Sequence, residues 1–170
     1  MKKFVIFTDS TADLPVDFIN RHKIEIIPLY YNMEDKVYGG DEDLEAGVFY
    51  EKMRTGIMPT TMASNPEFIA EKYSEYITQG IDILHIAFSS ALSGSCNNAF
   101  ITARELSEEN PSIKIVTIDS LAASMGQGLL VYKAVTMMEA GKTIEETAEY
   151  IEEIKLNLCH QFTVEDLNHL

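Results

Sequence analysis

The sequence predicts an α/β fold: a three-layer domain with a mostly parallel β-sheet between helices, followed by the start of a second domain at the C-terminal end. Short apolar runs of strand length alternate along the chain with segments whose apolar residues recur at helical spacing. This alternation is typical of a parallel sheet that is covered on both faces. The 170 residues, of which 46% are hydrophobic, suffice for one substantial core.

Four segments rich in apolar residues are predicted as strands. The first is continuous rather than alternating, which is typical of a strand buried on both faces. Pro28, inside the second segment, indicates an edge strand or the end of that strand. The four segments are residues 4–7, 24–31, 83–88 and 113–118.

Helices are predicted where apolar residues recur every three to four positions. The predicted helices are residues 14–22, with Pro15 in the first turn, 44–56, 66–80, 96–103, 121–140 and 144–154, and residues 32–43 and 58–64 are predicted as loops. Side chains suited to helix capping precede four of the helices, and they are Asp13, Asn65, Ser93 and Thr143.

The helix predicted over residues 121–140 is apolar nearly all round, which is typical of a buried helix. Gly126 and Gly128 lie inside it, where glycine weakens a helix. Because glycine has no side chain, we expect backbone or ligand to approach this helix closely at those two positions.

Composition excludes several classes of partner. The net charge of −14 opposes binding to nucleic acid or to an anionic membrane surface, since both need clustered basic residues. Cys96 and Cys159 form no C-x-x-C pair, so neither a disulfide framework nor a zinc site is indicated, and no cofactor is predicted. The sequence contains no signal-peptide pattern and no apolar run of membrane-span length, which predicts a cytoplasmic protein.

Polar clusters follow three of the four predicted strands. They are Thr8-Asp9-Ser10, Ser89-Ser90 and Asp119-Ser120. In a parallel sheet these strand ends share one edge, and open α/β folds bind their ligands at that edge. We expect the loop that carries Thr60 and Thr61 to join them there.

The stretch from residue 83 to 100 has the features of an anion site. A strand is followed by a turn with Ser93, Gly94 and Ser95 and then by a helix, whose first N–H groups lack partners and favour a negative charge. The serines add donors, and Gly94 allows close approach, so a carboxylate or a phosphate would fit. Taken alone, this stretch is better explained by Ser93 as a simple helix cap, but the convergence of the strand ends favours a ligand site.

Two enzyme classes are alternatives. Asp9 directly follows the first strand, as in aspartyl-phosphate enzymes, but Thr11 stands where a second acidic residue would hold Mg²⁺. A serine hydrolase using Ser93 would need G-x-S-x-G or a placed histidine, and His85 lies inside an apolar run that is typical of a core position. A pure interaction module is a third alternative.

Five motifs, in this order, resemble the DegV family of bacterial fatty-acid-binding proteins. They are T-D-S-T-A-D-L-P, I-P-L, P-T-T before N-P-E-F, S-S-A-L-S-G-S, and I-D-S-L-A-A-S-M-G-Q-G-L-L-V, and they extend over the whole chain. The resemblance implies a carrier, not an enzyme, that holds a long-chain fatty acid in a tunnel with its carboxylate at polar residues. In some members of the family a partner fatty-acid kinase phosphorylates that carboxylate.

By the same resemblance, Ser93 matches the carboxylate-binding serine of the family. Either Thr60 or Thr61 matches the threonine of the T-S loop, because this chain reads T-T-M-A where many members read T-S-Q-P. Together with the serines of the converging strand ends and the glycine after Ser93, the predicted ligand-binding residues are Ser10, Thr60, Thr61, Ser89, Ser93, Gly94 and Ser120.

The resemblance also divides the chain. Residues 1–157 are predicted as the DegV-like N-terminal domain, and residues 158–170 as the beginning of a truncated second domain. F-T-V-E-D-L-N-H-L resembles the family's entry to that domain, but the G-G-R-I that usually follows is missing. The missing part would carry an Arg and a His that belong to the family's head-group site.

Overall fold

A four-stranded parallel sheet forms the centre of the computed structural model, which describes residues 4–40 and 42–163. The strand order is β2-β1-β6-β7, and each neighbouring pair is parallel. The strands are β1 (Phe4–Asp9), β2 (Glu25–Ile27), β6 (Asp82–Ala87) and β7 (Ile115–Asp119). The predicted α/β fold is confirmed.

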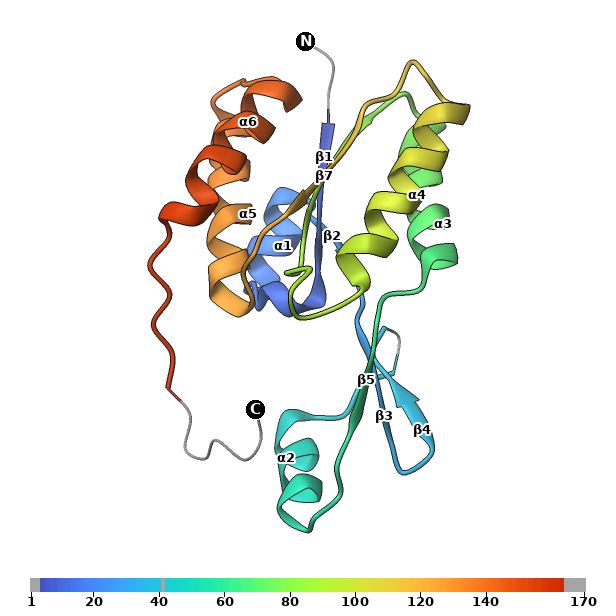
Figure 1. Ribbon diagram of the computed structural model, residues 1–170, viewed down its shortest axis with the longest axis vertical. Coiled ribbons are helices and arrows are strands. Elements are labelled where there is room, and N and C mark those ends of the chain that lie inside the picture. The colour runs from blue at the N-terminus through green and yellow to red at the C-terminus, as the bar shows by residue number, and fades with distance from the viewer. Residues whose placement is uncertain (1–3, 41, 164–170) are drawn as a thin grey trace.

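Helices cover both faces of this sheet (Figure 1). One face carries α1 (Val16–His22), α5 (Ser124–Glu139) and α6 (Ile144–Ile154), and the other carries α3 (Pro66–Ile77) and α4 (Ser95–Glu109). Two 3₁₀ turns complete this part of the chain, η1 (Ser10–Ala12) after β1 and η2 (Lys155–Asn157) after α6. None of the helices in the described ranges is both long and apolar enough to cross a lipid bilayer.

The core lies in two layers, one on each side of the sheet. Phe4 and Ile6 of β1 belong to the cluster under α5 and α6, whereas Val5 and Phe7 belong to the cluster under α3. Successive side chains of a strand point to opposite faces, so a strand buried on both sides needs apolar residues at consecutive positions. This explains the continuous apolar run at the start of the chain.

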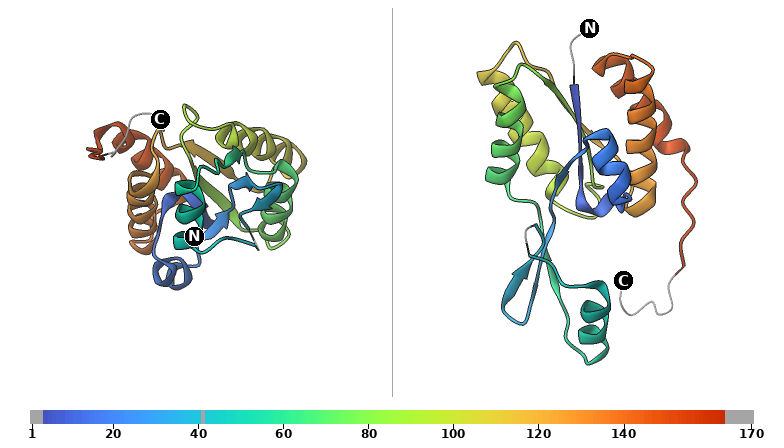
Figure 2. Two further views of the ribbon diagram at one scale, coloured as in Figure 1. Left: turned by 90° about the horizontal axis from the view of Figure 1, so that it is seen from below. Right: turned by 180° about the vertical axis from the view of Figure 1, so that it is seen from behind.

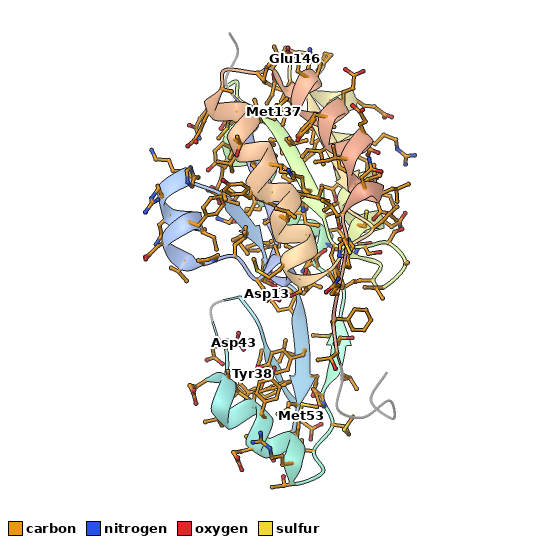
Figure 3. The ribbon with its side chains drawn as sticks, turned by 90° about the vertical axis from the view of Figure 1, so that its left-hand side faces the viewer. Asp13, Tyr38, Asp43, Met53, Met137 and Glu146 are labelled. Carbon is orange, nitrogen blue, oxygen red and sulfur yellow. The ribbon has the colours of Figure 1, made fainter. Side chains whose placement is uncertain are left out.

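A small antiparallel lobe lies beyond the carboxyl ends of the parallel strands (Figures 1 and 2). It consists of β3 (Tyr30–Met33), β4 (Lys36–Tyr38), β5 (Thr60–Met62) and α2 (Ala46–Arg54), with strand order β4-β3-β5. Tyr31 joins its parts, because its ring stacks on Tyr38 at 5.3 Å and meets Phe49 of α2 edge-on at 5.2 Å. Figure 3 shows Tyr38 and Asp43 in this lobe, at the far end of the molecule from Glu146, with Asp13 between them.

The lobe corrects three predictions. The single strand expected over residues 24–31 is two strands, because the chain leaves the parallel sheet after Ile27 and pairs antiparallel from Tyr30. Residues 32–43 and 58–64, expected as loops, contain β4 and β5. Glu34 and Asp35 form the two-residue turn between β3 and β4, with positive φ angles of 54° and 61°. This hairpin was missed because such turns usually carry Asn-Gly, which is the sequence signal for them.

The capping predictions are only partly confirmed. Asn65 accepts the Glu67 N–H at 2.8 Å, and Thr143 forms the predicted capping box. Asp13 was wrong as a cap, because α1 begins after Pro15 and Asp13 itself adopts a left-handed φ of 49°. The N-cap position of α4 belongs to Gly94, and Ser93 instead accepts the N–H of the first helical residue.

Helix α5 is buried on one side only, which corrects the prediction of a helix buried all round. Leu130 and Val131 are fully buried, but Met125 and Leu129 are 57% and 41% exposed. The expected close approach is confirmed at Gly128, where an added Cβ would lie 2.6 Å from the carbonyl oxygen of Ala12.

Only part of the range predicted as the beginning of a second domain, residues 158–170, is described. After Asn157, residues 158–163 contain neither helix nor strand, and residues 164–170 lie outside the described residues. The domain boundary at residue 157 stays a prediction.

Candidate functional site

The loops that follow β1, β6 and β7 meet at one edge of the sheet because these three strands are neighbours. Hydrogen bonds join the loops after β6 and β7 directly: Ser89 N–H donates to Ala122 O at 3.1 Å, and Ser120 N–H donates to Ala87 O at 3.1 Å. Ser89 and Ser120 are both buried. The structure therefore brings the predicted polar strand ends together and uses two of their serines to connect the loops.

Asp119 is tied to the loop after β6. Its carboxylate accepts the backbone N–H of Ser90 at 3.1 Å and the Ser90 hydroxyl at 2.5 Å, and also accepts the N–H of Leu121 at 3.1 Å. Partial burial by itself raises the pKa of Asp119, but these hydrogen bonds, with Lys155 nearby, hold the pKa below its ordinary value. Asp119 is therefore an ionised link between two loops.

The start of α4 presents hydroxyl groups around its first turn. The hydroxyls of Ser93 and Ser95 lie 2.9 Å apart, and the Ser93 hydroxyl accepts the Ser95 N–H at 3.2 Å. Ser93 is half-buried and Ser95 is fully buried, so Ser93 is the one that solvent or a ligand can reach. At Gly94 an added Cβ would meet only the Cβ of Ala63, at 3.9 Å, which leaves the backbone open to close approach. The geometry suits an oxyanion.

The loop after β5 also reaches the start of α4, but through a residue that the sequence analysis did not nominate. Ser64 N–H donates to the Ser95 hydroxyl at 3.0 Å, and the Asn98 side-chain amide donates to Ser64 O at 2.9 Å. Thr60 and Thr61 are exposed on β5, where they pair with Asn32 and Tyr31. The position of Ser64, directly before a helix cap in a hydroxyl-rich stretch, was the available signal.

Strand alternation separates the two threonines. The Cβ of Ala63 lies beside Gly94, and residues two apart in an extended chain point to the same side. If this alternation continues from β5 into Ala63, Thr61 is on the side of Ala63 and Thr60 on the opposite side. We therefore expect Thr61, rather than Thr60, to face the start of α4.

Ser10, the remaining nominated serine, supports the chain's passage into the lobe. Its hydroxyl accepts the backbone N–H of Leu29 at 3.0 Å, between β2 and β3. The Ser10 side chain is exposed, at the carboxyl end of β1.

Beneath these loops lies a buried polar group that the sequence analysis missed. Gln127 of α5 is fully buried and donates to Thr8 at 3.0 Å, and Asp9 is 1% exposed and accepts the Phe88 N–H at 2.5 Å. The signal for Gln127 was a polar residue between two glycines of an apolar helix. Within the described ranges no three His, Cys, Asp or Glu side chains are grouped so that they could hold a metal ion.

Cys96, in the first turn of α4, is not a candidate nucleophile. Burial raises the pKa of its thiol to about 12, with the negative charges of Asp119 and Asp9 acting in the same direction. The reactive form of cysteine is the thiolate, so a thiol held protonated is inert.

An apolar groove runs between α1 and α5. It has a volume of about 250 Å³ and is lined by Leu14, Pro15, Phe18, Met125, Gly128, Leu129 and Tyr132. Met125 and Leu129 lie one turn apart on α5, and Leu121, in the loop between β7 and this helix, adds a third apolar side chain near the carboxyl edge of the sheet; the three are 41–57% exposed. We call these three residues the α5 stripe.

Known proteins resemble this chain over nearly its whole length. A DegV domain-containing protein of Clostridium perfringens is 47% identical over 172 residues, which is 100% of this chain and 59% of the relative. The structure of a fatty-acid-binding DegV family protein from Thermus thermophilus matches with a TM-score of 0.82 at 30% identity, over 91% of this chain and 54% of that one. A stearic-acid-binding protein of Eubacterium ventriosum matches with a TM-score of 0.81 at 25% identity, over 88% of this chain and 52% of that one.

This chain therefore spans less than two thirds of the length of each of these relatives. The family model described as "Uncharacterised protein, DegV family" matches residues 3–170, and on that match and the 47% identity the chain belongs to the DegV family.

Proposed function

We propose that this chain binds a long-chain fatty acid, with the carboxylate at the start of α4 and the tail along the α5 stripe. The observation that carries the proposal is one edge of the sheet that combines an open, hydroxyl-bearing helix start with exposed apolar side chains. The fatty-acid-binding structures from the same family support it.

The head group would lie at Ser93 and Gly94. The half-buried Ser93 hydroxyl can donate to a carboxylate oxygen, while the first turn of α4 supplies a favourable dipole. Thr61 would add a donor from the lobe because it lies on the side of Ala63. A hydroxyl that bonds a charged group contributes about 1.5–3 kcal/mol.

The tail would supply most of the affinity. Burying about a dozen methylenes at about 0.8 kcal/mol each offers about 10 kcal/mol before the costs of association. The groove between α1 and α5 holds about 250 Å³, less than the range of about 300–1,000 Å³ that ligand pockets usually have. We therefore infer that further protein surface completes the tunnel, as expected if residues 158–170 lead into a second domain.

We infer a carrier rather than an enzyme. Asp9 is 1% exposed and its carboxylate faces protein donors, so it is badly placed to attack a phosphoryl group. Ser93 bonds to Ser95, and the buried His85 bonds to Tyr73 instead. A fatty-acid kinase is the proposed partner, because a carboxylate at the exposed Gly94 would remain accessible to it. The cytoplasmic location stays a prediction.

Native mass spectrometry of the protein expressed in bacteria tests the ligand class. We expect a population that retains one fatty acid, released on denaturation. Added palmitate should displace it, and hexadecane should displace it less effectively at the same concentration, because hexadecane has a tail of the same length but lacks the carboxylate. Protein that retains no lipid and binds no palmitate in titration would contradict the proposal, as would ester or phosphoester turnover that disappears in Ser93→Ala or Asp9→Asn.

A further inference from the structure

Gln127 joins three elements to α5 through a single side-chain amide. Its nitrogen carries two hydrogens and shares them among three acceptors: Thr8 Oγ1 at 3.0 Å, Ile86 O at 3.2 Å and Asp9 Oδ2 at 3.3 Å. Its oxygen accepts the Thr11 hydroxyl at 3.0 Å. Thr8 and Asp9 are the last two residues of β1, Thr11 lies in η1, and Ile86 lies near the end of β6. This one amide therefore holds α5 against the points where the loops after β1 and β6 begin.

Asp9 continues these contacts into the loop after β6. Its Oδ2 atom accepts the backbone N–H of Phe88 at 2.5 Å, and Phe88 is the residue directly before Ser89. Ser89 O in turn accepts the N–H of Ser93 at 3.1 Å. The position of Ser93 is therefore linked to Asp9 through one short loop.

A second side of Asp9 faces His85, whose Nε2 atom lies 3.7 Å from Asp9 Oδ1. His85 Nδ1 lies 2.6 Å from the Tyr73 hydroxyl of α3. Burial raises the pKa of Tyr73 well above its ordinary value, so the hydroxyl keeps its proton and can donate to Nδ1. His85 Nε2 is buried without a hydrogen-bond partner in the described part of the chain, and it faces Asp9 across a gap longer than a hydrogen bond. All three side chains are 0–1% exposed.

We propose that Asp9 and Gln127 form a buried brace that positions Ser93 and the loops around it without touching the ligand. A buried carboxylate is costly unless hydrogen bonds satisfy it, and a satisfied buried network fixes its surroundings more rigidly than apolar packing does. Here the network bonds to the backbone at the root of the β6–α4 loop. The proposal rests on the proposed function, since it assigns the brace to the head-group end of that site.

Two measurements on the full chain test the brace. Amide hydrogen exchange is compared between the unaltered protein, Gln127→Met, which keeps the volume but removes the amide, and Asp9→Asn. Thr147→Val is the matched control, because Thr147 is fully buried in α6 and bonds only to Thr143 O within that helix's first turn. The same four proteins are titrated with palmitate and with methyl palmitate.

We expect exchange at the Phe88 and Ser93 amides to rise about tenfold in Gln127→Met, the signature of a local opening, and to stay unchanged in the control. Palmitate affinity should fall about tenfold, while methyl palmitate affinity stays within about twofold, because the tail contacts are intact. Asp9→Asn should also raise amide exchange at Phe88 and Ser93 and lower palmitate affinity, because the Phe88 N–H then bonds to a neutral acceptor instead of a carboxylate.

The brace would be overturned if amide exchange at Phe88 and Ser93 were unchanged in Gln127→Met. It would also be overturned if that variant lost equal affinity for palmitate and for methyl palmitate. If Gln127→Met does not fold, Thr11→Val removes only the hydroxyl bond to the amide oxygen, and we expect the same pattern at about threefold. An unaltered protein that binds neither ligand would overturn the proposed function instead, while the exchange measurement would still decide whether the brace holds the loops.

Discussion

The backbone N–H of Ser64 donates to the hydroxyl of Ser95 at 3.0 Å, and this bond joins the antiparallel lobe to the first turn of α4. The two residues come from opposite sides of α3 in the chain. Because Ser95 also contacts Ser93, the lobe and the anion-binding turn are parts of one arrangement. A change in either is expected to alter binding of the head group.

Ser93→Ala should weaken fatty-acid binding by about 1–3 kcal/mol, because a hydrogen bond to a charged group is lost. Part of any loss in stability would come from the missing acceptor for the Ser95 N–H. Calorimetric titration with palmitate and its methyl ester separates the effects, since only the acid should lose affinity. Ser74→Ala is a control that removes a serine hydroxyl far from the proposed site, because that hydroxyl donates to Ala70 O within α3. Equal losses for acid and ester would mean that Ser93 does not bind the carboxylate.

The two threonines of β5 should differ in effect. Thr61→Val should weaken palmitate binding by about 1 kcal/mol or more through the loss of a hydroxyl donor, whereas Thr60→Val should leave it unchanged. The reason is strand alternation, which places only Thr61 on the side of Ala63 and Gly94. The two variants are matched controls for each other, and the reverse result would place the ligand on the opposite face of the lobe.

This chain alone should bind palmitate much more weakly than a chimera extended by the C-terminal part of the Clostridium perfringens relative. Without a cover, the α5 stripe leaves much of the tail in water, and each exposed methylene forfeits about 0.8 kcal/mol. The exposed stripe should also favour self-association, which light scattering can measure. Comparable affinities for the two proteins would show that residues 1–170 already enclose the ligand.

Ser90→Ala should destabilise the protein in a pH-dependent way. The pKa of Asp119 is held below its ordinary value of 3.8 by hydrogen bonds that include the Ser90 hydroxyl. A depressed carboxyl pKa stabilises the fold above the unfolded-state pKa and loses that effect as the pH falls through the folded-state value. The difference in free energy of unfolding between the two proteins should therefore be full near pH 7 and shrink below about pH 4.

Urea unfolding at a series of pH values measures this difference. Ser107→Ala provides the comparison, because the Ser107 hydroxyl on α4 donates to the carbonyl oxygen of Ala103 and not to a carboxylate. A deficit of the same size at pH 3 and pH 7 would show that Ser90 contributes through something other than its bond to ionised Asp119.

Much of the α/β part was predictable from the sequence, because a strand that is buried on both faces has a recognisable run of apolar residues. A strand between two helical layers needs apolar residues at consecutive positions, as in residues 4–7, and the polar residues that end such strands must then share one edge. Local signals were equally direct at Asn65 and Thr143, whose side chains cap the helices that follow them. Apolar runs and helix caps involve residues that are close together in the chain, so the sequence shows them directly.

Only the tertiary structure decided the antiparallel lobe, the exposed side of α5 and the residues that hold the site together. The strands of the lobe are three or four residues long, so their pairing depends on distant partners such as Tyr31 and Thr61 rather than on a periodic pattern. Likewise, Ser64 and Gln127 bond to residues 31 and 119 positions away. The sequence by itself determined which segments can form helices and strands, whereas contacts between distant segments determined which polar side chains are satisfied inside the fold and which stay available to a ligand.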